Sequence, residues 1–175
     1  MTQWTPEQGA ALAAVFDALT ASDMDWMVLR NYKGLPHNNP SKDIDIGVTP
    51  HNFLAAEQLI AQVMAAHGLP RKQTTVFEWG RCSSYYGVID GKPLSVKIDL
   101  MDGFSWRAAG LFNFEKLNQD TRLYDGFPVP NPIDDAVILW LKPLITGGFV
   151  KRAYVDRIAQ AVACLLYTSP SPRDL

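Results

Sequence analysis

The stretch that decides the fold lies at residues 41–48, which read SKDIDIGV. From Asp43 onward polar and apolar residues alternate, which predicts a half-buried β-strand over residues 43–48. The alternation places Asp43 and Asp45 on one face, with side-chain bases about 6 to 7 Å apart. Like charges this close resist joint ionisation unless a cation neutralises them. The strand therefore predicts a divalent-cation site, because Mg²⁺ takes one or two carboxylates together with phosphate oxygens of a substrate.

Upstream of this strand the sequence predicts a helix, a short strand and a loop. Thr5, Pro6 and Gln8 form an N-cap, a favoured first-turn proline and a capping-box partner, and apolar residues then recur at helical spacing. Residues 26–29, WMVL, form an apolar run whose length suits a buried strand. Residues 31–42, NYKGLPHNNPSK, contain two prolines, a glycine and three asparagines, which indicates a loop.

Downstream, Thr49 and Pro50 repeat the cap signal and start a helix that Gly68 ends. Residues 74–101 are rich in β-branched and aromatic residues, and the Asp90-Gly91 pair predicts a hairpin turn between two strands. The pattern weakens after residue 102 until a helix that Asn131 caps, Pro143 kinks and Gly147-Gly148 ends, and a last helix covers residues 150–163. This order predicts an α+β fold, a small mixed β-sheet with flanking helices.

A third carboxylate, Asp99, lies on the polar face of the second hairpin strand. If that strand neighbours the one at residues 43–48, then Asp43, Asp45 and Asp99 converge at one edge of the sheet. Three carboxylates are the minimum set for two metal ions about 3.5 to 4 Å apart. One ion would lower the pKa of an attacking hydroxyl, and the other would hold a triphosphate.

This arrangement resembles the nucleotidyltransferase superfamily with a polymerase-beta-like fold. Its usual pattern is a strand ending in Gly-Gly or Gly-Ser, about ten residues, an Asp-apolar-Asp or Asp-apolar-Glu pair, and later an Asp on a strand. Here the strand is WMVLRN, eleven residues follow Asn31, the pair is DIDI, and the later strand is VKIDLM, so the resemblance covers residues 26–101. More narrowly, VLRNYKGLP followed by SKDIDIGV is similar to uncharacterised members associated with bacterial surface-polysaccharide genes.

The resemblance implies an enzyme that moves a nucleoside monophosphate from a nucleoside triphosphate to an unidentified hydroxyl or phosphate acceptor and releases pyrophosphate. It implies Mg²⁺ as cofactor, with Mn²⁺ as an alternative. Asp43 and Asp45 would hold the metals, and Asp99 would bind the metal on the nucleophile side and act as general base.

One departure from the pattern matters, because Arg30 and Asn31 replace the Gly-Ser pair. Arg30 is then expected to hold phosphate through its fork of donors, or else to pair with Asp43 or Asp45 in a metal-free, inactive domain. Asn31 is a second candidate for substrate contact.

Three further side chains are candidates for phosphate contact. Ser41 and Lys42 adjoin the acidic strand, with a solvated turn as the alternative. Lys97 shares a face with Asp99, and the alternative there is a cross-strand ion pair. The three histidines lack metal-ligand spacing and are expected at the surface, and Cys82 is expected to be structural.

Two other functions stay open. A noncatalytic domain would keep the fold as a binding or regulatory module of a larger protein, and the altered Gly-Ser position motivates this reading. A sugar-transferring enzyme would use the acidic pair to hold a metal and a nucleotide sugar.

The composition of the chain excludes several classes of protein. The chain has 175 residues, 16 Lys plus Arg against 18 Asp plus Glu, and a formal net charge of −2, which argues against a protein that coats DNA or an anionic membrane. No apolar run approaches the roughly 18 residues of a spanning helix, and the amino terminus lacks a signal-peptide layout, so a cytoplasmic protein is expected. P-loop, Rossmann and α/β-hydrolase motifs are absent from the sequence.

The end of the chain does not resemble selected protein sequence. Residues 164–174, CLLYTSPSPRD, resemble the translation of a transposon-derived sequencing adapter. We therefore expect a nucleotidyltransferase-like domain over residues 1–163, truncated at its carboxyl end, and a non-native tail over 164–175. Without the tail Cys82 is the single cysteine, which fits a reducing compartment.

Overall fold

The computed structural model describes residues 4–39, 41–107 and 109–168 of the chain. Of the expected non-native tail, residues 169–175 lie outside this described part. The helices are α1 (Pro6–Ala21), α2 (Phe53–Ala66), α3 (Phe114–Leu117), α4 (Pro132–Gly147) and α5 (Arg152–Thr168), with 3₁₀ turns at Pro50–Asn52 and Asn118–Asp120. The strands are β1 (Trp26–Val28), β2 (Ile44–Val48), β3 (Arg71–Phe77), β4 (Gly80–Ile89), β5 (Lys92–Met101), β6 (Gly103–Trp106), β7 (Ala109–Asn113), β8 (Thr121–Tyr124) and β9 (Phe127–Pro130).

The main sheet has five strands in the order β1-β2-β5-β4-β3. The β2–β5 pair is parallel and the other neighbours are antiparallel, so the sheet is mixed. Two small hairpins, β6–β7 and β8–β9, stand beside it. The predicted α+β class, a small mixed sheet with flanking helices, is confirmed.

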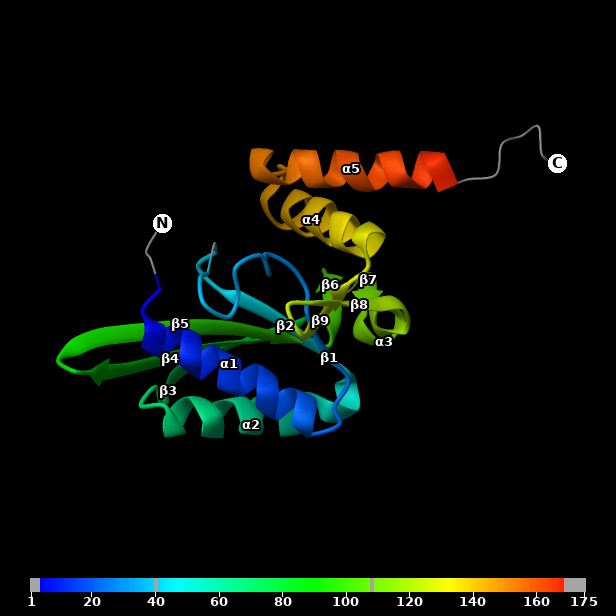
Figure 1. Ribbon diagram of the computed structural model, residues 1–175. Helices are drawn as coiled ribbons and strands as arrows, with labels where there is room; N and C mark the ends of the chain where they lie inside the picture. Colours follow the sequence, from blue (N-terminus) through cyan, green and yellow to red (C-terminus); the bar gives the residue numbers. More distant parts are fainter. Residues whose placement is uncertain (1–3, 40, 108, 169–175) are drawn as a thin grey trace, which may run out of the picture.

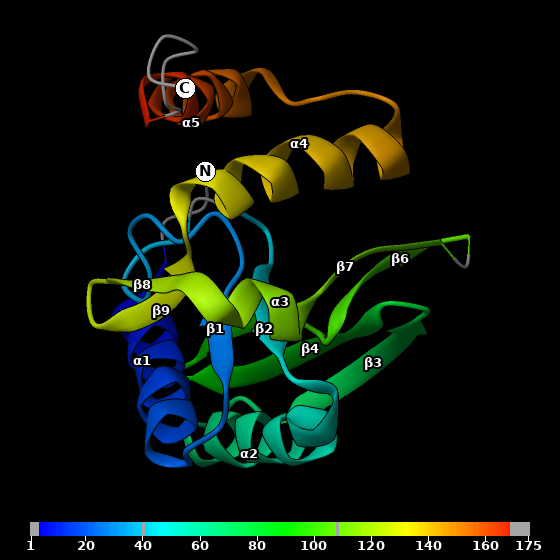
Figure 2. The same cartoon turned by 90° about the vertical axis from the view of Figure 1, so that its right-hand side faces the viewer.

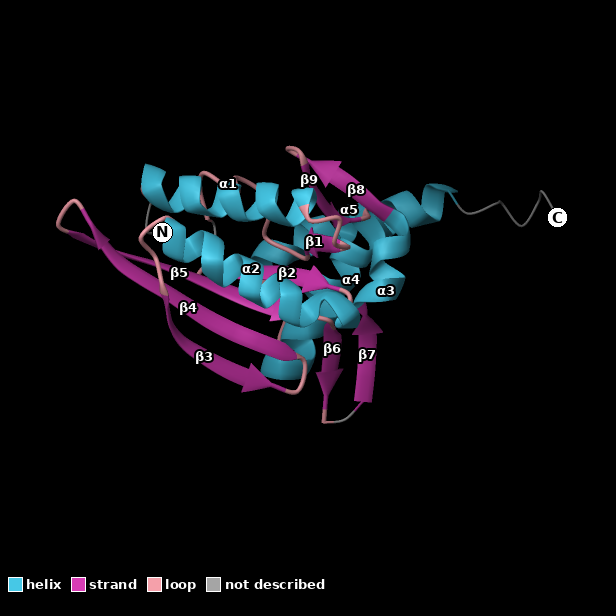
Figure 3. Ribbon diagram, turned by 90° about the horizontal axis from the view of Figure 1, so that it is seen from below, coloured by secondary structure: helices cyan, strands magenta, loops and turns pink. Residues whose placement is uncertain are grey.

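The helices cover the sheet from opposite sides. In Figure 1 α1 and α2 lie below the main sheet, while α4 lies above it and α5 lies beyond α4. The view in Figure 2 gives the same layering, with α4 between the strands and α5. Seen from below, α1 and α2 run side by side across the sheet (Figure 3).

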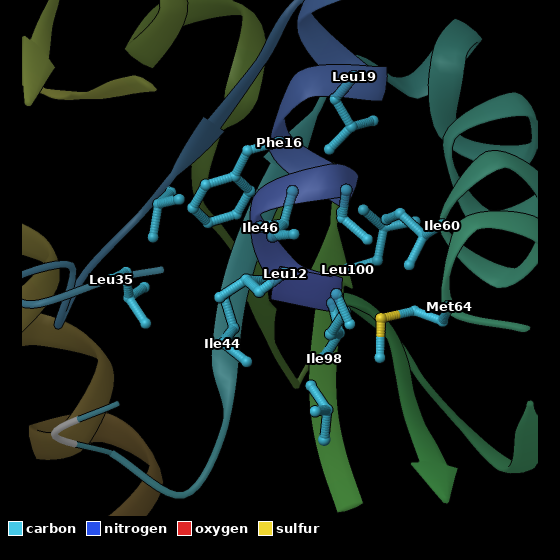
Figure 4. Packing of buried hydrophobic residues seen from close by; sticks show 14 of the residues in the cluster. Leu12, Phe16, Leu19, Leu35, Ile44, Ile46, Ile60, Met64, Ile98 and Leu100 are labelled. Carbon is cyan, nitrogen blue, oxygen red and sulfur yellow. The ribbon is translucent and has the colours of Figure 1, made fainter. Parts of the chain in front are cut away.

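The main core fills the space between α1, α2 and one face of the sheet. Its strand residues are the apolar side of the alternation, Ile44 and Ile46 on β2 with Ile98 and Leu100 on β5, and all are buried. Figure 4 shows helix side chains pointing at them, from α1 (Leu12, Phe16, Leu19) and α2 (Ile60, Met64). Because this face takes the apolar residues, Asp45 and Asp99 point to the opposite face, toward α4.

Several local predictions are confirmed. Thr5 and Gln8 form the capping box of α1. The β4–β5 turn has Asp90 at φ 51° and Gly91 at φ 74°, which is the double positive φ that a tight hairpin turn requires. Asn131 caps α4, which continues through Pro143.

Other expectations were wrong in detail. Strand β2 is buried on both faces, not half-buried, because α3 covers the second face, where Phe114 packs against Gly47. Helix α2 starts at Phe53, after a 3₁₀ turn. The Thr49 hydroxyl contacts the His51 ring and makes no capping hydrogen bond to a backbone amide of that turn. Strands β6 to β9 and α3 arise where the sequence pattern was weak. Within the described ranges no helix has the length and apolar character to cross a lipid bilayer.

Candidate active site

Two carboxylates face each other across the parallel β2–β5 pair of the main sheet. Asp45 on β2 is in register with Asp99 on β5, and Asp43 lies directly before β2. The predicted adjacency of the two strands is therefore confirmed. Residues in register on neighbouring strands project from the same face about 5 Å apart, so the sheet itself brings Asp45 and Asp99 together.

Asp45 is fully engaged by two cations. Arg30 donates from Nε to Asp45 Oδ2 at 2.7 Å and from Nη2 to Oδ1 at 3.0 Å. Lys142 of α4 donates from Nζ to Oδ1 at 2.9 Å. The Asp45 side chain is 1% exposed, so this three-residue cluster is buried. Of the two roles expected for Arg30, the structure contains the ion pair with Asp45.

The cations set the charge state of Asp45. Burial alone would disfavour its ionised form, but Arg30 and Lys142 outweigh that effect and lower the pKa of the carboxyl group to about 2. The same contact raises the pKa of the already basic Arg30 against its own burial. Asp45 is thus an anion at neutral pH.

Asp99, in contrast to Asp45, has a raised pKa. Burial and then the negative charges of Asp45 and Asp43 raise the pKa of its carboxyl group. Within the described part of the chain Asp99 Oδ1 has no hydrogen-bond partner, although the residue is only 6% exposed. The Cys82 thiol lies in register with Asp99 on β4, and burial and this carboxylate raise the pKa of the thiol to about 11. Cys82 is therefore a neutral neighbour of Asp99.

Asp43 is the most accessible of the three carboxylates. Its Oδ1 accepts a hydrogen bond from the Ser41 hydroxyl at 3.1 Å. Lys97 on β5 lies 3.9 Å from Oδ2, which is the cross-strand ion pair that sequence reasoning weighed for this lysine. Lys42 is exposed.

The remaining candidate, Asn31, has its side-chain hydrogen bond to α5 and not to a carboxylate. It adopts φ 55°, and its side-chain amide donates to the Tyr154 hydroxyl of α5 at 3.3 Å. The structure therefore gathers Arg30, Ser41 and Lys97 around the acidic residues, but neither Asn31 nor Lys42.

Lys142 is the site residue that sequence reasoning missed. Its Nζ lies 4.8 Å from the centre of the Trp79 ring and 5.7 Å from that of Phe104, and the side chain is 9% exposed. The two rings and Asp45 make a pocket for the ammonium group. No motif marks this lysine, because it lies 97 positions from Asp45 in the sequence. The one available signal was a charged residue within an otherwise apolar helical run.

Comparisons with known proteins bear on this geometry. No protein-family model matches the chain, and no curated protein matches it. Among solved structures, the crystal structure of ANT(2'')-Ia in complex with adenylyl-2''-tobramycin has a TM-score of 0.51 at 9% identity, over 90% of this chain and 89% of that chain. A solution structure of ANT(2'')-Ia gives the same TM-score and identity, over 90% and 84%. An antigenic nucleotidyltransferase-like protein from Paracoccidioides brasiliensis has a TM-score of 0.47 at 13% identity, over 95% and 79%.

The chain has a nucleotidyltransferase-like fold. At these identities the similarity is one of fold, and the activity must be argued from the residues of this chain.

A second polar cluster attaches α4 and α5 to the loop after β1 and to β8. Asp135 in the first turn of α4 accepts a hydrogen bond from the Tyr32 hydroxyl at 3.1 Å and pairs with Arg157 of α5. Arg122 of β8 donates to the same hydroxyl at 2.6 Å. Tyr32 lies two residues after Arg30, so the loop that holds Arg30 is tied to the helix that holds Lys142.

Proposed function

We propose that this chain is a nucleotidyltransferase that moves a nucleoside monophosphate from a nucleoside triphosphate to an acceptor hydroxyl or phosphate, with release of pyrophosphate. The observation that carries the proposal is the parallel β2–β5 register, which sets Asp45 opposite Asp99 with Asp43 two positions earlier, on a nucleotidyltransferase-like fold. Phosphoryl transfer needs positioning and charge neutralisation more than covalent chemistry. The carboxylates on this face of the sheet would position a cation, and the cation would neutralise the phosphate charge.

The carboxylates fit a divalent cation in part. Asp99 Oδ1 is buried without a partner among the described residues, and a cation beside it would satisfy it. Asp43 is near enough to Asp99 for its charge to raise the Asp99 pKa, and it is partly exposed. No group of three or more His, Cys, Asp or Glu side chains in the described ranges is arranged to hold a metal ion. Asp45 binds Arg30 and Lys142 instead. Asp43 and Asp99 are thus the side chains that would hold Mg²⁺ or Mn²⁺.

Each residue has a role in this proposal. A bound divalent cation would neutralise triphosphate charge and lower the pKa of an acceptor hydroxyl. Asp99 is the proposed acceptor of the proton of that hydroxyl. Lys97, which is 44% exposed and 3.9 Å from Asp43, is free to turn toward a phosphate.

A second candidate function is a noncatalytic binding module. The observation that favours it is the saturation of Asp45, whose two oxygens both accept hydrogen bonds from buried cations. In such a module Arg30 and Lys142 would replace metal altogether, and the domain would be indifferent to divalent ions.

Isothermal titration calorimetry separates the two candidates. A nonhydrolysable analogue of each nucleoside triphosphate is titrated into the 175-residue chain with and without Mg²⁺. The enzyme proposal predicts binding that requires Mg²⁺ and is lost in Asp99→Asn. The module predicts the same heats with and without Mg²⁺ and in the variant, and that result would overturn the proposal.

Transfer itself is then tested with triphosphates labelled at the α-phosphate. Tobramycin is a reasonable first acceptor, because a structure of similar fold contains adenylyl-2''-tobramycin, and carbohydrate acceptors follow from the resemblance to polysaccharide-associated proteins. A labelled acceptor that does not form with Asp99→Asn supports the proposal. Transfer of sugar label from a nucleotide sugar would instead support the sugar-transferring alternative.

A further inference from the structure

The cations on Asp45 carry the charge that one divalent metal ion would supply. Arg30 and Lys142 each bring one positive charge to the same carboxylate, at 2.7 Å and 2.9 Å. Both side chains are nearly buried, at 12% and 9% exposed, and Asp45 is 1% exposed. Water therefore screens these charges little, and the pair neutralises Asp45 more strongly than surface ion pairs do.

Specific contacts hold the Lys142 ammonium group in place. A lysine side chain ordinarily extends its ammonium group into water. Here the ammonium group lies over the Trp79 and Phe104 rings, from the β3–β4 turn and from β6, and 3.8 Å from the Met101 sulfur. Three segments of the fold thus hold this charge against the Asp45 carboxylate.

The other two carboxylates lie on the same face of the sheet and, within the described part of the chain, have no buried cation bound to them. Asp99 Oδ1 has no partner among the described residues, and Asp43 is accessible. The carboxylates therefore divide into Asp45, which two buried cations neutralise, and the Asp43–Asp99 pair. Beside that pair lies Lys97, which is 44% exposed and 3.9 Å from Asp43 Oδ2, and an ion on Asp43 and Asp99 would displace it toward solvent. Two metal ions on three carboxylates would require Asp45 oxygens that Arg30 and Lys142 occupy.

We propose that Arg30 and Lys142 replace one of two divalent cations, so that this site takes a single divalent cation, on Asp43 and Asp99, together with the nucleoside triphosphate. This inference rests on the proposed function and specifies its metal requirement. Lys142 is a positioning residue in this reading, because it acts on the ion through Asp45. Without the Lys142 ammonium group, Asp45 Oδ1 keeps only the 3.0 Å bond from Arg30, so one acceptor position on that oxygen becomes available to a second ion.

Counting bound Mn²⁺ tests the inference without any need for turnover. The electron paramagnetic resonance signal of free Mn²⁺ is followed while the ion is titrated into the full chain with a saturating nonhydrolysable triphosphate analogue. The parent chain is expected to bind one Mn²⁺ per chain. Lys142→Met, which keeps a long apolar side chain against Trp79 and Phe104, is expected to bind two.

Matched variants exclude indirect effects. Lys142→Arg keeps the charge and should bind one Mn²⁺. Lys116→Met on α3 removes an exposed lysine from another helix and should also bind one. If Lys142→Met does not fold, as circular dichroism would reveal, the parent count decides alone.

The possible outcomes are distinguishable. Two Mn²⁺ ions on the parent chain would overturn the single-ion inference while leaving the proposed function intact. One ion on both the parent and Lys142→Met would also overturn it, because the loss of Lys142 would then not have made Asp45 available to a second ion. No Mn²⁺ bound to the parent with any triphosphate analogue would overturn the proposed function and the inference together.

Discussion

At the residue scale, Asp45 and Asp99 face each other across the sheet with opposite energetic roles. Asp45 is an anion between two buried cations, whereas Asp99 has a raised pKa and no hydrogen-bond partner for Oδ1 among the described residues. One carboxylate stabilises the fold, and the other is held in an unfavourable environment. Functional carboxylates often stand in such environments, because a site built for a ligand is strained without it.

Asparagine substitutions at the two positions should therefore change stability in opposite directions. Asp45→Asn leaves Arg30 and Lys142 buried without a counter-charge and should lower the free energy of unfolding by about 3 to 5 kcal/mol. Asp99→Asn removes a carboxyl group whose ionised form is disfavoured by burial and by Asp45, and should raise it by about 0.5 to 2 kcal/mol in metal-free buffer. Urea unfolding at pH 7 measures both, and destabilisation of equal size in the two variants would contradict this division.

The depressed pKa of Asp45 predicts a pH dependence with a definite sign. Its pKa falls from an ordinary 3.8 to about 2 on folding. The stability that it contributes is therefore present above pH 4 and is lost as the pH falls toward 2. The difference in unfolding free energy between the parent and Asp45→Asn should shrink by about 1 kcal/mol between pH 7 and pH 3. A difference that stays constant over this range would show that Asp45 is not ionised beside its cations.

Sequence reasoning predicted that the strands carrying Asp45 and Asp99 are neighbours, which the structure confirms, but it did not predict the contact of Lys142 with Asp45. Asp43, Asp45 and Asp99 follow from strand alternation, and the pairing of Arg30 with an aspartate was one of two alternatives for that residue. The contact of Lys142 with Asp45 could not be predicted, because it depends on how α4 packs over the sheet. A charged residue within an apolar helical run marks the lysine but not its partner.

At the element scale, the second face of β2 depends on one small residue. A Cβ atom on Gly47 would lie 2.5 Å from Phe114 Cδ2 and 3.0 Å from Leu29 Cδ2. Phe114 is buried at 1% exposed, so α3 rests directly on the strand that carries Asp45. Sequence reasoning predicted β2 as half-buried because α3 follows a segment of weak pattern, and alternation on a strand cannot reveal what covers its polar side.

Gly47→Ala should therefore destabilise the protein by about 1 to 3 kcal/mol, because Phe114 must shift within a packed core. Gly110→Ala is the matched control, since no atom lies within 4 Å of the added Cβ there. Thermal unfolding of both variants measures the effect. Equal melting temperatures for the two would indicate that α3 does not press on β2.

At the scale of the whole molecule, the helices on the two faces of the main sheet make different contributions. The α1 and α2 layer supplies the main core, whereas α4 brings a charged residue to the opposite face of the sheet (Figures 1 and 2). The class and order of the elements could be predicted from periodicity and caps. The short hairpins β6–β7 and β8–β9 could not, because strands of four or five residues have little pattern of their own and are defined by what they pack against.

The most direct measurement is thermal unfolding of the full chain with Mg²⁺ and each nucleoside triphosphate, beside the Asp43→Asn variant. Asp43 is partly exposed, so this variant should fold like the parent. A ligand at 100 times its dissociation constant adds about 2.7 kcal/mol to the stability of the folded state. We predict that at least one triphosphate raises the melting temperature of the parent only with Mg²⁺, and that the shift disappears in Asp43→Asn. No shift with any triphosphate, or an equal shift in the variant, would contradict a metal-dependent nucleotide site at these carboxylates.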